Sequence, residues 1–320
     1  MTFGSAPTLS LGVEEELFLV DGDTLELAPI FDQVVPDPGP HLKPELFACI
    51  VETATPVCPD ADSVLAELQR SRAKVADRTA IVASGMHPLA VGDGQRIAPV
   101  PRYERMAHEL GMAVYTQLVC GLHIHVAMPD RGTALHAFEG VVPWLPTLLA
   151  LSANSPFLEG RPTGLRSTRA ERLLLMPTGG TPPLLPDWET WEEATAGDKG
   201  RRHWDAWPRP EHGTLEVRIM DQQTDVRRSA GFGAIVQALV AAVLRDDAEP
   251  YDRELYAQRR TDAARHAPDP SEARALAELL QPSALAEHVL SERPEAERQL
   301  ELGPEAALRD IAERSLPSDR

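Results

Sequence analysis

The clearest alternation of apolar and polar positions lies in residues 121–128, GLHIHVAM. Because side chains alternate across a strand, this stretch predicts a strand with one face fit for a core. That apolar face would be formed by Leu122, Ile124, Val126 and Met128. The opposite face would carry His123 and His125 beside the small residues Gly121 and Ala127. A strand with such a face displays candidate ligands for a metal ion or a phosphate.

Two further stretches repeat this two-faced pattern. Residues 9–20 predict a strand with Glu14 and Glu16 on one face and mainly apolar residues on the other, which Glu15 interrupts. Residues 213–220 alternate strictly and place Glu216 and Arg218 on one face. If the three apolar faces are buried against helices, the three polar faces will line a common concavity.

Helical spacing predicts the elements that would cover these strands. Asp60 is the predicted N-cap of a helix, and the end of that run, residues 80–84, fits a strand equally well. Further helices are predicted at 103–118, at 229–246 and at 133–152, where two prolines must kink or divide the helix.

Residues 43–57 fit either a helix or a strand. Glu45 and Glu52 lie seven positions apart, so they would share a face on a helix but not on a strand. After about residue 250 the chain becomes rich in Ala, Glu and Arg, and prolines divide it into short helices. Because no repeat and no strong linker is visible, we expect a single domain over residues 1–320 with a helical C-terminal extension from about 250.

Composition narrows the class of protein. The chain of 320 residues is 43% hydrophobic and 25% charged, as in ordinary globular proteins. The net charge of −18 argues against nucleic-acid and anionic-membrane partners, which need a cationic surface, although acidity can also serve solubility alone. Three cysteines without CxxC spacing fit a reducing compartment. The N-terminus lacks the pattern of a signal peptide, and the most apolar helical run, 234–244, is too short to span a bilayer. We therefore expect a cytoplasmic protein.

The predicted concavity gathers carboxylates, which are costly to bury without a counter-charge. A divalent cation removes that cost, and a carboxylate-rich site with an imidazole suits Mg²⁺ or Mn²⁺ better than closed zinc coordination. Arg218 beside Glu216 could then neutralise a phosphoryl group during transfer. Each polar pair alone is more often structural, for example as a cross-strand ion pair. The conjunction of three pairs favours a site.

The sequence resembles the glutamate–cysteine ligase type 2, or carboxylate–amine ligase, family through an ordered set of motifs over about residues 9–245. These are LGVEEELFLVD at 11–21, KPELFACIVETATPVC at 43–58, GMHP at 85–88, RYERM at 102–106, CGLHIHV at 120–126, LSANSPFLEG at 151–160, SxR at 167–169, HWD at 203–205 and HGTLEVRIMD at 212–221. The ordered set is highly specific, although no single motif is.

The resemblance implies an α+β, glutamine-synthetase-like catalytic domain. Its sheet would be curved and mainly antiparallel, with helices packed on one face and an active-site funnel on the other. It implies an ATP-dependent ligase that phosphorylates a carboxylate and then joins the acyl group to an amine. The family's default substrates are glutamate and cysteine, which give γ-glutamylcysteine. Partners would be these small molecules, and family members are often homo-oligomers.

The family's functional residues carry over by position. One Mg²⁺ or Mn²⁺ ion would be held by Glu14, His123 and Glu216, and the other by Glu16, Glu45 and Glu52. The resemblance implies that His125 and Arg218 contact the ATP phosphates as catalytic residues, and that Arg169 binds a substrate carboxylate. Two segments depart from the family pattern. Residues 160–164 lack an acidic residue, and Trp207 replaces an arginine for which the nearby Arg209 could substitute at the substrate.

Two alternatives remain open at this point. A metal-dependent hydrolase would use His123 and His125 on one tightly bound zinc ion and would bind no nucleotide. A catalytically silent relative would bind a nucleotide or an amino acid without turnover. The departures at 160–164 and 204–210 motivate this second alternative, whereas the retention of every predicted metal carboxylate argues against it.

Overall fold

The computed structural model describes residues 2–316 apart from 178, 198–202, 246–249 and 281. Its centre is a seven-stranded sheet in the order β10-β11-β5-β1-β3-β2, with β4 paired to β1 as well. All of these pairings are antiparallel. The strands are β1 (Leu11–Val20), β2 (Leu42–Pro44), β3 (Ile50–Ala54), β4 (Ala80–Val82), β5 (Gly121–Ala127), β10 (Ala206–Arg209) and β11 (Thr214–Asp221). The three two-faced stretches are therefore adjacent strands, β1, β5 and β11.

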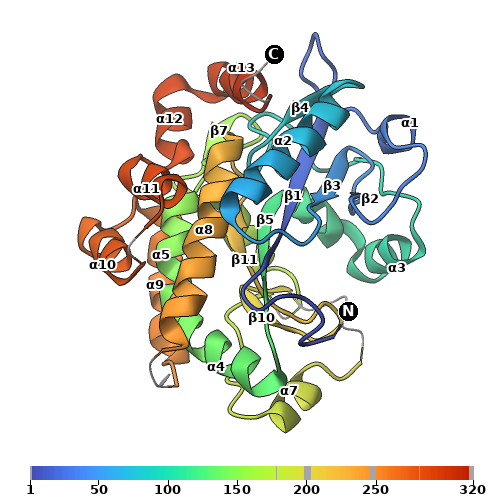
Figure 1. The fold of residues 1–320 in the computed structure, drawn as a ribbon. Coiled ribbons are helices and arrows are strands. Elements are labelled where there is room, and N and C mark those ends of the chain that lie inside the picture. Colours follow the sequence, from blue (N-terminus) through green and yellow to red (C-terminus); the bar gives the residue numbers. More distant parts are fainter. Residues whose placement is uncertain (1, 178, 198–202, 246–249, 281, 317–320) are drawn as a thin grey trace.

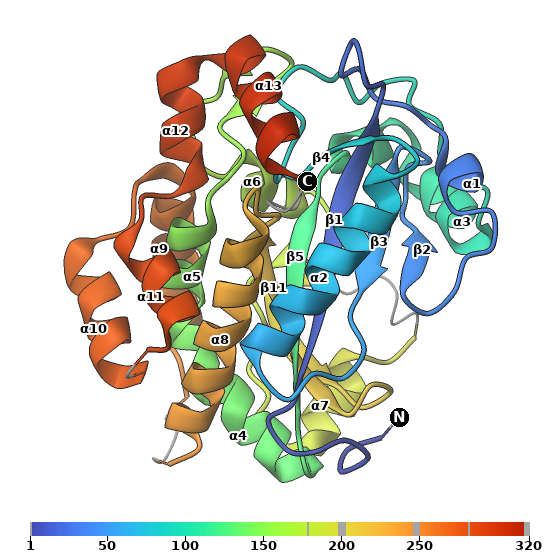
Figure 2. The ribbon, with the colours of Figure 1, turned by 45° about the horizontal axis from the view of Figure 1, so that its top comes forward.

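Helices cover the apolar face of these strands (Figures 1 and 2). This layer consists of α2 (Ala61–Ala76), α4 (Arg131–Val141), α5 (Leu145–Ser152) and α8 (Val226–Val243). The prolines at 143 and 146 divide the predicted 133–152 helix into α4, the 3₁₀ turn Val142–Trp144 and α5. Asp60 caps α2 by accepting a hydrogen bond from the Ser63 amide, as predicted. The layered antiparallel sheet confirms the α+β class.

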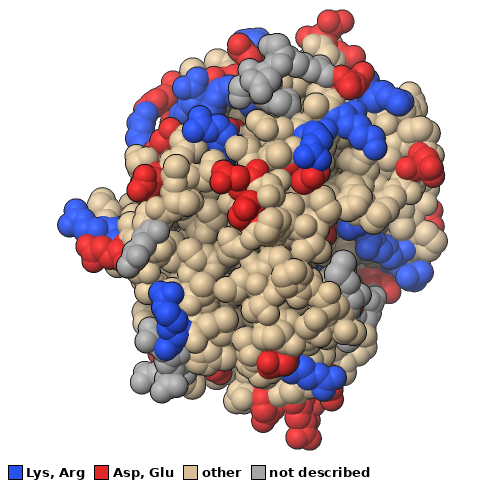
Figure 3. Space-filling model, viewed as in Figure 1, with Lys and Arg blue, Asp and Glu red and all other residues tan. Residues whose placement is uncertain are grey.

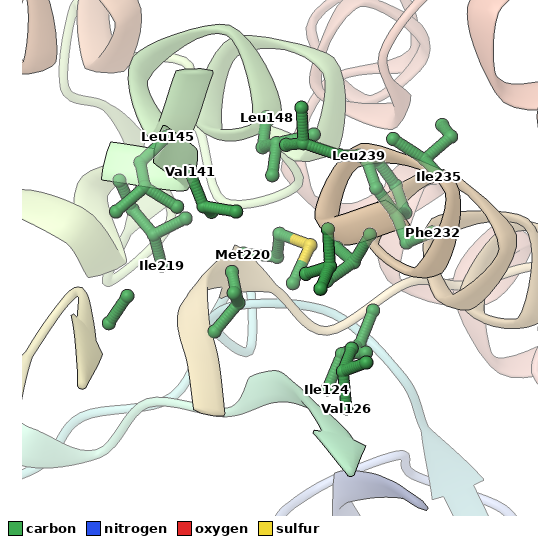
Figure 4. Packing of buried hydrophobic residues seen from close by; sticks show 14 of the residues in the cluster. Ile124, Val126, Val141, Leu145, Leu148, Ile219, Met220, Phe232, Ile235 and Leu239 are labelled. Carbon is green, nitrogen blue, oxygen red and sulfur yellow. The ribbon is translucent and has the colours of Figure 1, made fainter. Parts of the chain in front are cut away.

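The main core lies between this helix layer and the sheet. Figure 4 shows Phe232, Ile235 and Leu239 of α8 in one cluster with Leu148 of α5 and with Ile124 and Val126 of β5, all of them buried. The helix α8 is rich in alanine and valine, and it is apolar on most of its surface because it is buried on most sides. In Figure 3, drawn from the helix side, a broad uncharged area occupies the middle of the face, with charged residues around it. Packing on this side leaves the polar face of the sheet for the site.

The helices after residue 250 pack into the same core. They are α9 (Arg253–Arg265), α10 (Pro270–Leu280), α11 (Ala284–Ser291), α12 (Glu295–Leu302) and α13 (Pro304–Arg314). Buried side chains from the first three of these helices belong to the same hydrophobic cluster as α8 and the sheet. In α13, Leu308 and Ile311 instead join a cluster with Phe18 and Val82 at the other end of the sheet.

Shorter elements surround the rim of the sheet. They are α1 (Phe31–Val34), α3 (Pro101–Leu110), the 3₁₀ helix Gly111–Gln117, β6 (Phe157–Leu158), β7 (Arg161–Pro162), α6 (Thr168–Leu173), β8 (Gly179–Gly180), α7 (Trp188–Ala194) and β9 (His203–Trp204). The predicted 103–118 helix is thus α only as far as Leu110. Gly111, with φ of 55°, ends it in a conformation that glycine adopts without strain.

Two ambiguous stretches are resolved as strands. Residues 80–82 form β4, and the 43–57 stretch forms β2 and β3 with a loop between them. Glu45 lies in that loop and Glu52 in β3, so neither a common helix nor a common strand brings them together.

The expectation that the most apolar helix is too short to span a bilayer is wrong. Both α8 and the helical run Arg131–Ser152 are long and apolar enough by length and composition. Because 72% of the most apolar 18-residue window of each is buried within the fold, both behave as core helices.

Glu15, which interrupts the apolar face of β1, is neutralised inside the core. Both its carboxylate and the Arg72 guanidinium of α2 are fully buried, and Arg72 donates to both carboxylate oxygens at 2.9 and 2.5 Å. Gln222 and Ser229 also donate to Glu15 at 2.7 and 2.6 Å. A buried charge with this many partners belongs to the structure of the core rather than to the site on the opposite face.

Candidate metal and phosphate site

The polar faces of neighbouring strands place the site residues in register. Glu16 of β1 pairs across the sheet with Glu52 of β3, and Glu14 pairs with His123 of β5. On the other side of β5, His125 pairs with Glu216 of β11. Because cross-strand partners on one face have Cβ atoms about 5 Å apart, this register alone assembles a continuous row of acids and imidazoles.

The row forms the floor of a cavity of about 510 Å³. Nine of the ten predicted site residues line it, namely Glu14, Glu16, Glu45, Glu52, His123, His125, Arg209, Glu216 and Arg218. The loop after β2 brings Glu45 to the cavity, and the helix α3 forms one wall with Arg102, Tyr103 and Arg105. The concavity predicted from strand periodicity is therefore present.

One set of candidate ligands, here termed the first ligand group, comprises Glu14, His125 and Glu216. Their ligand atoms lie within 4.8 Å of one another. His123 is equally close, with its Nδ1 atom 3.6 Å from Glu14 and 4.0 Å from Glu216. The Nε2 atoms of both histidines are buried and have no hydrogen-bond partner among the described residues. Buried, unpartnered imidazole nitrogens beside carboxylates are the state expected of metal ligands in the absence of the metal.

The two histidines are equally close to the carboxylates, but their pKa values shift in opposite directions. Burial and the nearby Arg218 lower the pKa of His123 to about 4, so this ring is neutral and able to ligate a metal. Burial would also lower the pKa of His125, but contact with Glu14 and the charge of Glu216 raise it above its ordinary value. His125 Nδ1 lies 2.9 Å from the Thr214 hydroxyl, which fixes the ring. This pattern agrees with His123 as the ligand and His125 as the phosphate contact, which stay predictions.

The second ligand group comprises Glu16, Glu45 and Glu52, whose ligand atoms also lie within 4.8 Å of one another. Burial and the charge of Glu45 raise the pKa of Glu16 to about 8. Burial and the charges of Glu14 and Glu45 raise the pKa of Glu52 to about 7. These carboxyls are therefore short of positive charge, and a divalent cation would supply it.

Glycine at the start of β5 is required by the close approach of two side chains. A Cβ atom on Gly121 would lie 2.2 Å from Nη2 of Arg169 and 2.9 Å from Nε2 of His123. Without that atom, the Gly121 amide donates to Glu16 at 2.5 Å. The glycine thus allows the backbone to hold one carboxylate of the second ligand group.

Glu216 is the best compensated acid of the site. Its Oε2 atom accepts from the Trp207 indole at 3.0 Å and from Arg209 at 2.5 Å. Its Oε1 atom faces Arg218 at 3.3 Å and His125 at 4.0 Å. Burial opposes ionisation of this carboxyl, but Arg209 and Arg218 hold its pKa well below the ordinary value. Glu216 is therefore a carboxylate at all physiological pH values.

Arg169 is the predicted site residue that does not line the cavity. It is 2% exposed and lies beside Gly121 and His123 at the start of β5, where it donates to the backbone oxygens of Ile219 and Arg218 at 3.1 and 3.2 Å. It also lies 3.8 Å from Asp221. Its assignment to a substrate carboxylate stays a prediction, and its position in the structure is that of a support for β11. Segment 160–164 likewise lies outside the cavity lining, whereas Trp207 and Arg209 of the other departing segment belong to it.

Several lining residues were missed from the sequence. Lys43 pairs with Glu52 at 2.8 Å and lies 3.5 Å from Glu14. Tyr103 donates to Glu45 and accepts from Arg102. His203, whose Nε2 atom has no hydrogen-bond partner within the described part of the chain, also faces the cavity. Tyr103 and His203 stand in the motifs RYERM and HWD, but those motifs carry no alternation that would have assigned them a face.

Comparison with known proteins shows to which family the chain is similar. The model of glutamate–cysteine ligase family 2 matches residues 10–314. The chain belongs to this family. A glutamate–cysteine ligase of Natronomonas pharaonis is 34% identical, over 96% of this chain and 88% of that protein. Another, from Haloferax volcanii, is 35% identical, over 75% of this chain and 73% of that protein.

The fold is shared with solved ligases. A glutamate–cysteine ligase of Francisella tularensis in complex with AMP superposes with a TM-score of 0.69 over 98% of this chain and 89% of that one, at 15% identity. A bifunctional glutathione synthetase of Pasteurella multocida gives 0.63 over 96% of this chain and 50% of that one, at 13% identity. As a member of glutamate–cysteine ligase family 2, the chain is an enzyme of the ligase class. The alternative of a zinc hydrolase is therefore wrong.

Proposed function

We propose that this family member is an ATP-dependent carboxylate–amine ligase that works through an acyl phosphate, with glutamate and cysteine as its substrates. The observation that carries the proposal is the pair of ligand groups on one cavity floor, with Arg209 and Arg218 beside them. Five carboxylates and two imidazoles facing one space need cations, and arginines beside them need an anion. A nucleotide triphosphate with divalent ions satisfies both requirements.

The residues fit Mg²⁺ or Mn²⁺. The first ligand group offers the carboxylates of Glu14 and Glu216, to which the neighbouring His123 adds the predicted imidazole ligand, and the second group offers three carboxylates. Such oxygen-rich donor sets are the ones that these ions prefer. Each group supplies three ligands and would leave positions for water and phosphate oxygens. When bound, such ions would neutralise the charge that develops during phosphoryl transfer.

The reaction proceeds in two steps that the chain's own residues position. An oxygen of the substrate carboxylate attacks the γ-phosphorus of ATP, the bond from that phosphorus to the β–γ bridging oxygen breaks, and ADP leaves. The neutral amine then attacks the acyl carbon, and phosphate leaves as the amide forms and the nitrogen loses a proton. Arg218, 18% exposed and facing the cavity, is placed to stabilise the transferring phosphoryl group. His125 is oriented by Thr214 for a phosphate oxygen.

The two ends of the cavity differ in chemistry and suggest how the substrates lie. A largely apolar groove of about 320 Å³ adjoins it and shares Glu14, Lys43, His125 and His212 with its lining. We place the adenosine there, because a purine and ribose need apolar walls beside the phosphate ligands. The opposite wall carries Arg102 and Arg105 from α3, which suit the carboxylates of amino acids.

The test is an ADP-release assay with Mg²⁺ and ATP over a panel of carboxylates and amines that includes glutamate with cysteine. Mass spectrometry of the product would show γ-glutamylcysteine, and ¹⁸O in the substrate carboxylate would appear in the released phosphate if an acyl phosphate forms. Glu16→Gln and Arg218→Ala should each abolish most turnover, while Arg70→Ala, at an exposed position on α2, should not. Absence of ADP release with every pair, despite binding of ATP, would support the silent relative instead.

A further inference from the structure

Lys43 links the two ligand groups. It stands on the edge strand β2, directly across from Glu52 in the register of β2 and β3. Its ammonium lies 2.8 Å from Oε1 of Glu52 and 3.5 Å from Oε1 of Glu14. Glu52 belongs to the second ligand group and Glu14 to the first. The positive charge therefore lies between two carboxylates that are otherwise assigned to different metal ions.

Lys43 lies between Glu14 and Glu52, where a cation is needed to separate the two carboxylates. Two facing carboxylates at the boundary of two acidic groups repel each other unless a positive charge separates them. An ammonium has three N–H donors, of which two suffice for Glu14 and Glu52. The third remains available for a ligand, because Lys43 lines both the main cavity and the adjoining groove.

The charge count agrees with this position. The carboxylates of the two ligand groups are five in number. Two divalent ions and one ammonium neutralise them, so that Arg209 and Arg218 are left to meet the anionic phosphates. A third divalent ion between Glu14 and Glu52 would instead need to displace the ammonium from both carboxylates.

We propose that Lys43 is a built-in cation that occupies the position between the two ligand groups, so that this chain binds two divalent ions and not three. This inference rests on the proposed function, since it assumes that both ligand groups bind metal. The role of Lys43 is positional: it holds Glu14 and Glu52 at a fixed separation and presents one N–H to the phosphate chain of the nucleotide.

The test counts Mn²⁺ ions bound per chain, by electron paramagnetic resonance of free Mn²⁺ in an equilibrium titration at mildly alkaline pH, with Mn²⁺ alone as the probe. The wild type should bind two ions. Lys43→Met keeps the apolar stem and removes the charge, so it should gain a third ion. Lys74→Met, at an exposed position near the end of α2, removes the same charge away from the cavity and should bind two.

The outcomes separate this inference from the function on which it rests. Three ions in the wild type, a result that needs no variant, would overturn the role of Lys43 and leave the ligase intact. Two ions in both wild type and Lys43→Met, with unchanged affinities, would do the same. No bound Mn²⁺ in any variant would overturn both the inference and the proposed metal site.

Discussion

Removal of divalent ions should make the stability of this protein fall as the pH rises. In the metal-free fold, Glu16 and Glu52 have pKa values of about 8 and about 7, against 4.5 for an ordinary glutamate. A carboxyl whose pKa is raised on folding holds its proton in the native state after the unfolded chain has lost it. The native state then binds more protons than the unfolded state, and stability decreases with pH between the two pKa values.

The magnitude follows from the same two groups. The pH window in which the two carboxyls dominate runs from about 6.5 to about 8. Below pH 6.5 the unfolded chain protonates the residues His123 and His203, whose pKa values are lowered in the native state, so stability there falls as the pH falls. The two carboxyls together hold about 1.7 protons that the unfolded chain lacks at pH 6.5, and about 0.6 at pH 8. At about 1.4 kcal/mol per proton and pH unit, the free energy of unfolding should drop by on the order of 2 kcal/mol. His125, with its raised pKa, contributes in the same direction.

The assay is equilibrium urea unfolding followed by circular dichroism at several pH values across this window, with EDTA or with Mg²⁺. EDTA should reveal the fall, whereas saturating Mg²⁺ should remove it, because metal-bound carboxylates no longer take up protons. Glu16→Gln should lose the larger part of the pH slope, and Glu26→Gln, at an exposed position in the turn after β1, should keep it. Equal or rising stability toward pH 8 in EDTA would refute the reasoning, since it would mean that the second ligand group already has its counter-charge.

Three further changes test separate parts of the structure. Arg72→Met should lower the free energy of unfolding by about 3–5 kcal/mol, because it leaves Glu15 charged in the core, and denaturation with and without Mg²⁺ should show the same loss. Arg218→Ala should reduce kcat by roughly 10³-fold while Mn²⁺ binding in titrations stays near that of the wild type, and weakened Mn²⁺ binding would assign Arg218 to the metal site instead. Thr214→Val should cut turnover by about 10-fold by releasing the His125 ring, and Thr214→Ser should restore it; equal activity of both variants would show that the hydroxyl does not position the ring.

Strand periodicity predicted the floor of the site because the information is local. In β1, β5 and β11 each polar pair stands at i and i+2, and one apolar face fixes which way the pair points. The register between strands, which places Glu16 opposite Glu52, is set by long-range pairing and is invisible in any one stretch. Residues on loops and on the edge strand, such as Glu45 and Lys43, could therefore be assigned only through resemblance or not at all.

Arg169 is a motif residue whose contacts could not be predicted from the sequence. Its motif suggests a substrate contact, yet the side chain is buried against Asp221 and the backbone of β11. Asp221 in turn accepts from the hydroxyl groups of Ser155 and Ser167 at 2.7 and 2.8 Å. A motif retained for such a network has the same residue types as one retained for a ligand, so the sequence cannot separate the two roles.

The distribution of counter-charge does separate structural acids from functional ones in this fold. On the helix side of the sheet, Glu15 has Arg72, and Asp205 has Arg260 at 2.7 Å, both within the described core. On the cavity side, the second ligand group packs three acids together with one ammonium at its edge. Folding alone would favour losing such acids, because each raises the pKa of its neighbours and destabilises the native state. A divalent cation from outside the chain would stabilise them, and this is the physical argument behind the metal-dependent chemistry that we propose for the cavity.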